Sequence, residues 1–141
     1  MKTTYYIILM LLAGVVAAIG TMYDVYLIGR DGGITEADKL IGNAVEITFI
    51  WIFVIAAIIP RDSWWIVGIM FVNTLIFWWL CHDVFINIGL HVSVWYIGMG
   101  PFDQFMGAIF QQSGALYIGA RLFLLLIGSL TYFSLTKKQH V

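Results

Sequence analysis

Five ionisable side chains interrupt the apolar stretches of this chain, and their types suit chemistry: Asp24, Glu46, His82, Asp83 and Arg121. A charge at the centre of a membrane-spanning helix costs about 2.5–3.5 kcal/mol on insertion scales, so such residues usually face a bundle interior and serve a function. Carboxylates and imidazoles transfer protons, and the planar guanidinium fork binds acidic groups. We therefore expect Glu46, His82 and Asp83 as catalytic residues, and Asp24 and Arg121 as ligand-binding residues.

Other polar side chains extend this candidate site. Residues three or four positions apart share a helix face. Three polar residues share a face with members of the set and are expected to bind the ligand: Asn43 with Glu46, Asn87 with Asp83, and Tyr117 with Arg121. His91 would continue the row of Asp83 and Asn87, whereas His82 points about 100° away from Asp83 around the axis. A purely structural alternative remains, in which Arg121 forms only an ion pair with Glu46 or Asp24 and binds no ligand.

The histidines do not make a convincing metal site. His82, Asp83 and His91 are residue types that bind zinc, but their spacing matches no zinc motif. A step of nine residues turns about 900° around a helix, so His82 and His91 face apart. A shared metal would require the helix to break near Gly89. The spacing favours a site without metal, and the identity of any cofactor stays unknown.

The amino-acid composition indicates that this chain lies in a lipid bilayer. The chain has 141 residues, of which 62% are hydrophobic and 11% charged, whereas soluble domains average about 25% charged residues. So few charges cannot cover a water-exposed surface, so the lipid bilayer must solvate much of the exterior. The net charge of −1 offers no basic patch and no argument for a nucleic-acid partner. The chain is expected to be one integral membrane domain, residues 1–141.

Four apolar segments have the length of about 20 residues that a bilayer requires. These segments are 5–28, 40–59, 64–85 and 115–135. The first also resembles a secretory signal peptide, with Lys2 before an apolar core and Ala17-Ala18 after it, but its apolar character continues to Ile28. We therefore expect a retained helix and an all-α, four-transmembrane-helix bundle.

The charges between these segments predict the orientation. On the side of the bundle where both termini lie, there are four basic residues: Lys2, Arg61, Lys137 and Lys138. The opposite side has only Arg30 and Lys39, which nearby acidic residues offset. The positive-inside rule then places both termini in the cytoplasm of an inner or plasma membrane. Asp24 lies six residues before Arg30 and so about 9 Å below the outer boundary, and similar counts place the other four ionisable groups in the outer leaflet.

The long outer connection, 86–113, is apolar for a loop. Gly98-Met99-Gly100-Pro101 breaks any helix, and residues 102–112 are expected to form a short amphipathic helix lying in the interface. Such a segment would cover an outward-facing site.

Three functions remain open at this stage. The leading hypothesis is a pocket in the outer leaflet that binds or chemically alters a small amphipathic or lipid-like molecule. The second is a proton- or metal-coupled small transporter, which would need a homo-oligomer because four helices leave little room for a pathway. The third is a structural or assembly subunit, whose ionisable side chains would face lipid or a partner. Residue types alone do not separate an enzyme from a binding protein.

Overall fold

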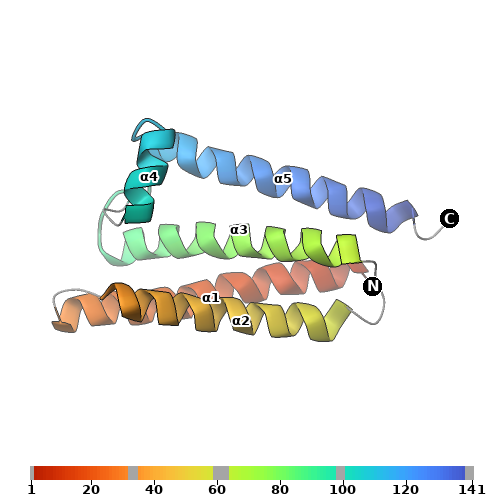
Figure 1. Cartoon of the computed structure of the whole chain (residues 1–141), viewed down its shortest axis with the longest axis horizontal. Coiled ribbons are helices and arrows are strands. Elements are labelled where there is room, and N and C mark those ends of the chain that lie inside the picture. The colour runs from red at the N-terminus through yellow and green to blue at the C-terminus, as the bar shows by residue number, and fades with distance from the viewer. Residues whose placement is uncertain (1, 32–34, 59–63, 98–100, 139–141) are drawn as a thin grey trace.

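The computed structural model describes residues 2–31, 35–58, 64–97 and 101–138, and in these ranges the chain is helical with no strand (Figure 1). The helices are α1 (Lys2–Asp31), α2 (Glu36–Ile58), α3 (Trp64–Gly89), α4 (Pro101–Ile109) and α5 (Gly114–Lys138). The all-α expectation is confirmed. Each long helix contains or nearly matches one of the four apolar segments, and α4 lies where the short helix was expected.

Three of these helices are long and apolar enough to cross a membrane by length and composition. They are Thr4–Arg30, Trp64–Gly89 and Gly114–Lys137. In α2 the apolar helix that can be assessed is shorter, Ile41–Ile52. The membrane-compatible character of the chain is therefore confirmed, while the fourth span and the location of the termini stay predictions. Residues 59–63, which join the second and third apolar segments, lie outside the described residues.

The four long helices run side by side, and α4 lies across one end of them (Figure 1). This end, called the α4 end below, holds the last turns of α1 and α3 and the first turns of α2 and α5. The most extensive packing is between α1 and α3. Helix α5 packs against α3, and α2 packs against both α1 and α3. Ala13 and Ala17 are completely buried, because small side chains let two helices approach closely.

Local hydrogen bonds fix where the helices begin and end. Thr35 Oγ1 accepts the backbone N–H of Asp38 at 3.2 Å and so caps α2. Ser113 Oγ accepts the backbone N–H of Leu116 at 3.3 Å at the start of α5. At the end of α3, His91 has a φ of 57°, a left-handed conformation that stops the helix. The expected helical row of Asp83, Asn87 and His91 is therefore wrong beyond Asn87, and His91 is exposed.

A buried polar cluster joins three helices near the opposite end of the bundle. Asn73 on α3 donates to the Tyr6 hydroxyl on α1 at 3.1 Å, and this hydroxyl pairs with Ser129 Oγ on α5 at 2.7 Å. The Asn73 amide lies so close to Gly128 that a Cβ there would overlap it. Gly128 thus permits the close contact of α3 with α5.

Candidate functional site

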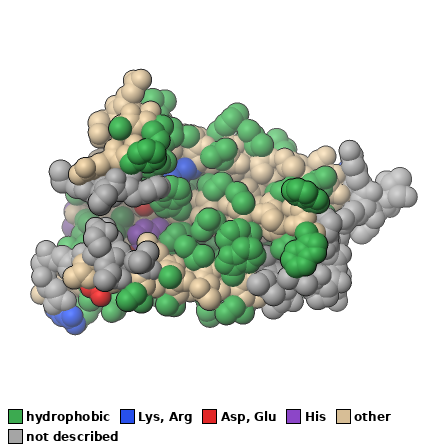
Figure 2. Space-filling model, viewed as in Figure 1, with side chains coloured by type: hydrophobic (Ala, Val, Ile, Leu, Met, Phe, Trp, Pro, Cys, Tyr) green, Lys and Arg blue, Asp and Glu red, His purple; other side chains and the backbone are tan. Residues whose placement is uncertain are grey.

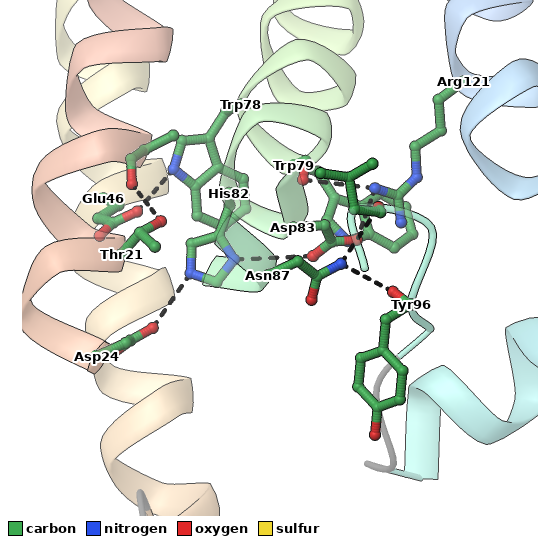
Figure 3. A network of polar contacts seen from close by, with 12 residues as sticks. Thr21, Asp24, Glu46, Trp78, Trp79, His82, Asp83, Asn87, Tyr96 and Arg121 are labelled. Atoms are coloured by element: carbon green, nitrogen blue, oxygen red, sulfur yellow. Dashed lines mark hydrogen bonds and ion pairs between the residues drawn. The ribbon is translucent and has the colours of Figure 1, made fainter. Parts of the chain in front are cut away.

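Four ionisable side chains form a continuous sequence of contacts across three helices at the α4 end (Figure 3). Asp24 Oδ2 on α1 lies 3.2 Å from His82 Nε2 on α3. Nδ1 of the same imidazole lies 3.8 Å from Asp83 Oδ1. Asp83 Oδ2 then accepts a hydrogen bond of 2.7 Å from Arg121 Nη1 on α5. The side chains of Asp24, His82, Asp83 and Arg121 are called the charged relay below.

The Arg121 guanidinium is enclosed by aromatic rings. Its Cζ atom lies 3.9 Å from the ring centroid of Trp79 and 3.8 Å from that of Tyr117, distances at which cation–π attraction is strong. Arg121 Nη1 also approaches the Trp79 carbonyl oxygen at 3.4 Å. Only 4% of Arg121 is exposed. Its ion pair is with Asp83, and not with Glu46 or Asp24 as the sequence suggested.

Glu46 reaches the site from α2 and binds a tryptophan. Its Oε2 atom accepts a hydrogen bond of 2.6 Å from the indole Nε1 of Trp78, whose ring lies 5.5 Å from that of His82. The carboxylate also lies directly over Gly20 of α1, where any Cβ would collide with it. Gly20 of α1 and Trp78 of α3 therefore position Glu46 about one helical turn farther from the α4 end than Asp24 (Figure 3).

The remaining expected site residues have different fates. Asn87 donates to the carbonyl oxygens of Val94 and Tyr96 at 3.3 and 2.9 Å, so it fastens the segment that follows α3 (Figure 3). Tyr117 contacts Arg121 through its ring, and its buried hydroxyl has no hydrogen-bond partner among the described residues. Asn43 is half-buried on α2 and forms no side-chain hydrogen bond within the described part of the chain.

Trp78 and Trp79 were not among the expected site residues, although a spacing signal existed. They precede His82 and Asp83 by four positions, so each lies one helical turn from an ionisable partner. Tryptophan is common at membrane interfaces, so anchoring at the interface alone is sufficient to explain these two residues in the sequence. The indole N–H of Trp78 and the ring of Trp79 are both parts of the site.

The relay is partly open to the outside. The side chains of His82 and Asp24 are 12% and 15% exposed, and that of Asp83 is 28% exposed. Figure 2 shows histidine and acidic atoms at the surface near the α4 end, between apolar side chains. A small molecule could therefore reach the acidic groups, whereas Arg121 is covered.

The charges in the relay alternate in sign when His82 is doubly protonated. A doubly protonated imidazole has two N–H donors, which suits His82 because a carboxylate lies near each of its nitrogens. In that state two carboxylates, one imidazolium and one guanidinium sum to zero, and Glu46 is the additional acid. Within the described ranges, no three His, Cys, Asp or Glu side chains are placed to hold a metal ion.

Comparison with known proteins identified no relative of this chain. No family model, no curated protein and no solved structure matches this chain.

Proposed function

We propose that this chain is a four-span integral membrane protein, with both termini in the cytoplasm, that binds a small amphipathic molecule at the α4 end. Glu46, His82 and Asp83 would supply hydrogen bonds or proton transfer to the polar part of the ligand. The lipid-like part would lie among the apolar helix faces. The segment through α4 would lie over the site in the outer interface.

One observation carries this proposal: ionisable side chains from four helices converge on one partly open site. Asp24, Glu46, His82, Asp83 and Arg121 come from α1, α2, α3 and α5, and they interact within one copy of the chain. An assembly subunit would instead direct such groups toward lipid or a partner chain. Convergence in the monomer therefore favours a binding site over an assembly surface.

Exposed aromatic side chains support the membrane placement. Large aromatic residues are exposed near both ends of the bundle, as in the interfacial belts of membrane proteins. Near the α4 end these are Tyr23, Tyr26, Trp95, Tyr96 and Phe105; near the opposite end they are Tyr5, Trp64, Trp65 and Phe133. The distance between the belts fits a bilayer, since the 26 residues of α3 span about 39 Å at the α-helical rise.

The test compares Glu46→Gln with the wild type. Both proteins are purified in a mild detergent, and the small molecules that co-purify are extracted and weighed by mass spectrometry. We expect the wild type to retain an amphipathic compound in a stoichiometric amount, and Glu46→Gln to lose at least tenfold of it. Asp38→Asn makes the same acid-to-amide change at an exposed position of α2 and should retain the compound. Equal retention in Glu46→Gln, or none in the wild type, would overturn the proposal.

A proton-coupled transporter is the second candidate function. The observation that favours it is the carboxylate–imidazole–carboxylate order of Asp24, His82 and Asp83, which can pass a proton between helices. Liposomes containing the protein and a pH-sensitive dye distinguish the two functions. Proton flux in the wild type that Asp24→Asn abolishes supports transport, and its absence supports binding alone.

A further inference from the structure

A tyrosine hydroxyl without a partner lies inside the bundle at the α4 end. The Tyr117 hydroxyl oxygen is buried and has no hydrogen-bond partner among the described residues, and only 4% of Tyr117 is exposed. By contrast, the buried hydroxyl of Tyr6 contacts both Ser129 and Asn73. A buried hydroxyl without a hydrogen bond is costly, so its presence in a folded protein requires an explanation. The Tyr117 hydroxyl therefore indicates a partner that the chain itself does not supply.

The surroundings of Tyr117 favour a hydrogen-bond acceptor as that partner. The centre of its ring lies 3.8 Å from Arg121 Cζ, and the guanidinium has donors only and attracts electron-rich atoms. Asp83 already balances the charge of Arg121 at 2.7 Å, and Glu46 is a further acid of the site. The site therefore offers no net positive charge to an anion. An uncharged acceptor fits best, such as the carbonyl oxygen of an ester or ketone.

An apolar groove lies next to Tyr117, on the surface that α5 shares with α4. Its volume is about 440 Å³, and its lining includes Phe110, Leu116, Gly119 and Phe123. Leu116 and Phe123 are exposed, so the groove is open on the side that lipid would contact. The Phe110 ring also packs on the Tyr117 ring, with 5.4 Å between their centroids. Phe110 is thus a wall of the groove and a contact of Tyr117 at the same time.

The backbone that follows Phe110 is strained. Gln111 and Gln112 have φ angles of 52° and 60°, in the left-handed region that residues other than glycine rarely adopt. These two residues join α4 to α5. Helix α4 packs on α5 and leaves Phe105 and Ile109 exposed. Rotation about Gln111 and Gln112 would therefore move α4 and Phe110 without disturbing the packing of the long helices.

From these features we propose that α4 is a lid over a binding site for an uncharged carbonyl compound with a hydrocarbon chain. The Tyr117 hydroxyl donates a hydrogen bond to the carbonyl oxygen, and the chain lies in the groove between α4 and α5. Phe110 moves with the lid and connects the groove to Tyr117. This inference rests on the proposed function and assigns the chemical class of its ligand.

The first experiment uses the full chain in detergent with two probes that have the same hydrocarbon chain: methyl oleate, an uncharged ester, and oleyl phosphate, an anion. Native mass spectrometry measures how much of each probe binds. We expect the wild type to bind methyl oleate at least tenfold more tightly than oleyl phosphate, and Tyr117→Phe to bind methyl oleate at least tenfold more weakly. Equal binding of methyl oleate by Tyr117→Phe, or a preference for oleyl phosphate, would overturn the assignment.

Thermal unfolding without a probe separates this role from a structural one. Tyr117→Phe keeps the ring against Arg121 and removes a hydroxyl that lacks a partner, so the unfolding temperature should be unchanged or higher. Tyr6→Phe is the matched control, since it removes a paired hydroxyl. It should lower the unfolding temperature and leave methyl oleate binding unchanged. A lower unfolding temperature for Tyr117→Phe would show that its hydroxyl is already paired, contrary to the proposal.

Phe110→Ala tests the lid. Without the Phe110 ring, Tyr117 is uncovered even when α4 stays in place, so methyl oleate should associate at least tenfold faster. Stopped-flow measurement of tryptophan fluorescence follows the association, because Trp79 contacts the Tyr117 ring. An unchanged rate would show that Phe110 does not control access.

Gly119→Leu tests the groove. A Cβ at Gly119 would have no atom within 4 Å, so the larger side chain should leave the fold unchanged while methyl oleate binding weakens at least tenfold. Gly68→Leu is the control, since Gly68 is equally open but lines a separate groove between α3 and α5. If Tyr117→Phe and Gly119→Leu bind methyl oleate normally while Glu46→Gln loses its co-purifying compound, this inference fails and the proposed function stands. If the wild type binds neither probe and retains no amphipathic compound, both fail.

Discussion

Arg121 is the most deeply buried charged side chain in the described part of the protein, and its surroundings explain how it is tolerated. A guanidinium removed from water needs an opposite charge and hydrogen-bond acceptors, since its lost hydration costs several kcal/mol. Asp83 supplies the charge at 2.7 Å, and the rings of Trp79 and Tyr117 lie against the guanidinium at nearly right angles to each other. The ion pair therefore joins α5 to α3 at the point where the guanidinium is buried.

Removing one member of this pair should be worse than removing both. Asp83→Asn leaves the Arg121 charge buried without its carboxylate, and we expect a loss of about 3 kcal/mol in the free energy of unfolding. The double variant Asp83→Asn/Arg121→Gln should lose less, because it removes the buried guanidinium together with its carboxylate. Thermal unfolding in detergent, followed by circular dichroism, compares the two. A double variant less stable than Asp83→Asn would contradict this account.

At the scale of elements, small residues set how closely the helices pack. Gly20 leaves room for the Glu46 carboxylate between α1 and α2, and Gly128 leaves room for the Asn73 amide between α3 and α5. Both sites place a polar side chain of one helix against the backbone of another. The chain thus uses glycine where a hydrogen-bonding group must lie inside the bundle.

Alanine substitutions should separate these glycines from exposed ones. Gly128→Ala forces its methyl group into Asn73 and disturbs the bonds to Tyr6, so we expect a lower unfolding temperature. Gly42→Ala adds its methyl group in open space and should raise stability by about 0.5–1 kcal/mol through helix propensity. The same unfolding assay measures both, and equal effects at the two positions would disprove the packing argument.

A second prediction for the elements concerns Glu46 alone. Gly20→Ala should displace the Glu46 carboxylate from Trp78 without replacing any ionisable residue. We expect the tryptophan fluorescence to change and the co-purifying ligand to be reduced, as in Glu46→Gln. Gly29→Ala, also on α1 but facing open space, should change neither quantity.

At the scale of the whole molecule, the helices alternate in direction, so α1 begins and α5 ends at the same end (Figure 1). With a cytoplasmic N-terminus, cysteines placed at positions 4 and 137 should be protected in intact cells, and one at position 92 should react. The variants Thr4→Cys, Val92→Cys and Lys137→Cys are made in a Cys81→Ser background and treated with an impermeant maleimide. Different accessibility at positions 4 and 137 would contradict the four-span topology.

The sequence predicted the helices of this molecule better than it predicted their contacts. Length and hydropathy located the four long helices, because the cost of exposing backbone polar groups to lipid leaves few alternatives. The same residues pointed to an ionisable cluster at one end. The pairing of residues within this cluster was harder to predict, since it depends on how each helix is rotated about its axis. Asp83, rather than Glu46 or Asp24, supplies the salt bridge to Arg121 in the structure.

Side-chain reach accounts for a further difference. His82 and Asp83 are consecutive and start about 100° apart on the helix, yet the His82 ring extends far enough to lie between Asp24 and Asp83. Helical spacing describes where side chains begin and not where their polar atoms end. The left-handed residue His91 and the bonds of Asn87 to the following segment also depend on tertiary contacts that spacing does not encode.

The bridge between Asp83 and Arg121 also has a consequence for biosynthesis. In the proposed topology the ribosome makes α3 before α5, so Asp83 would enter the membrane before its guanidinium partner exists. Until α5 is inserted, the nascent protein would carry an acid within the bilayer without this counter-ion, which is energetically costly. A chain that stops after α4 should therefore be recognised as incomplete and degraded, and the last helix completes the protein by supplying a charge.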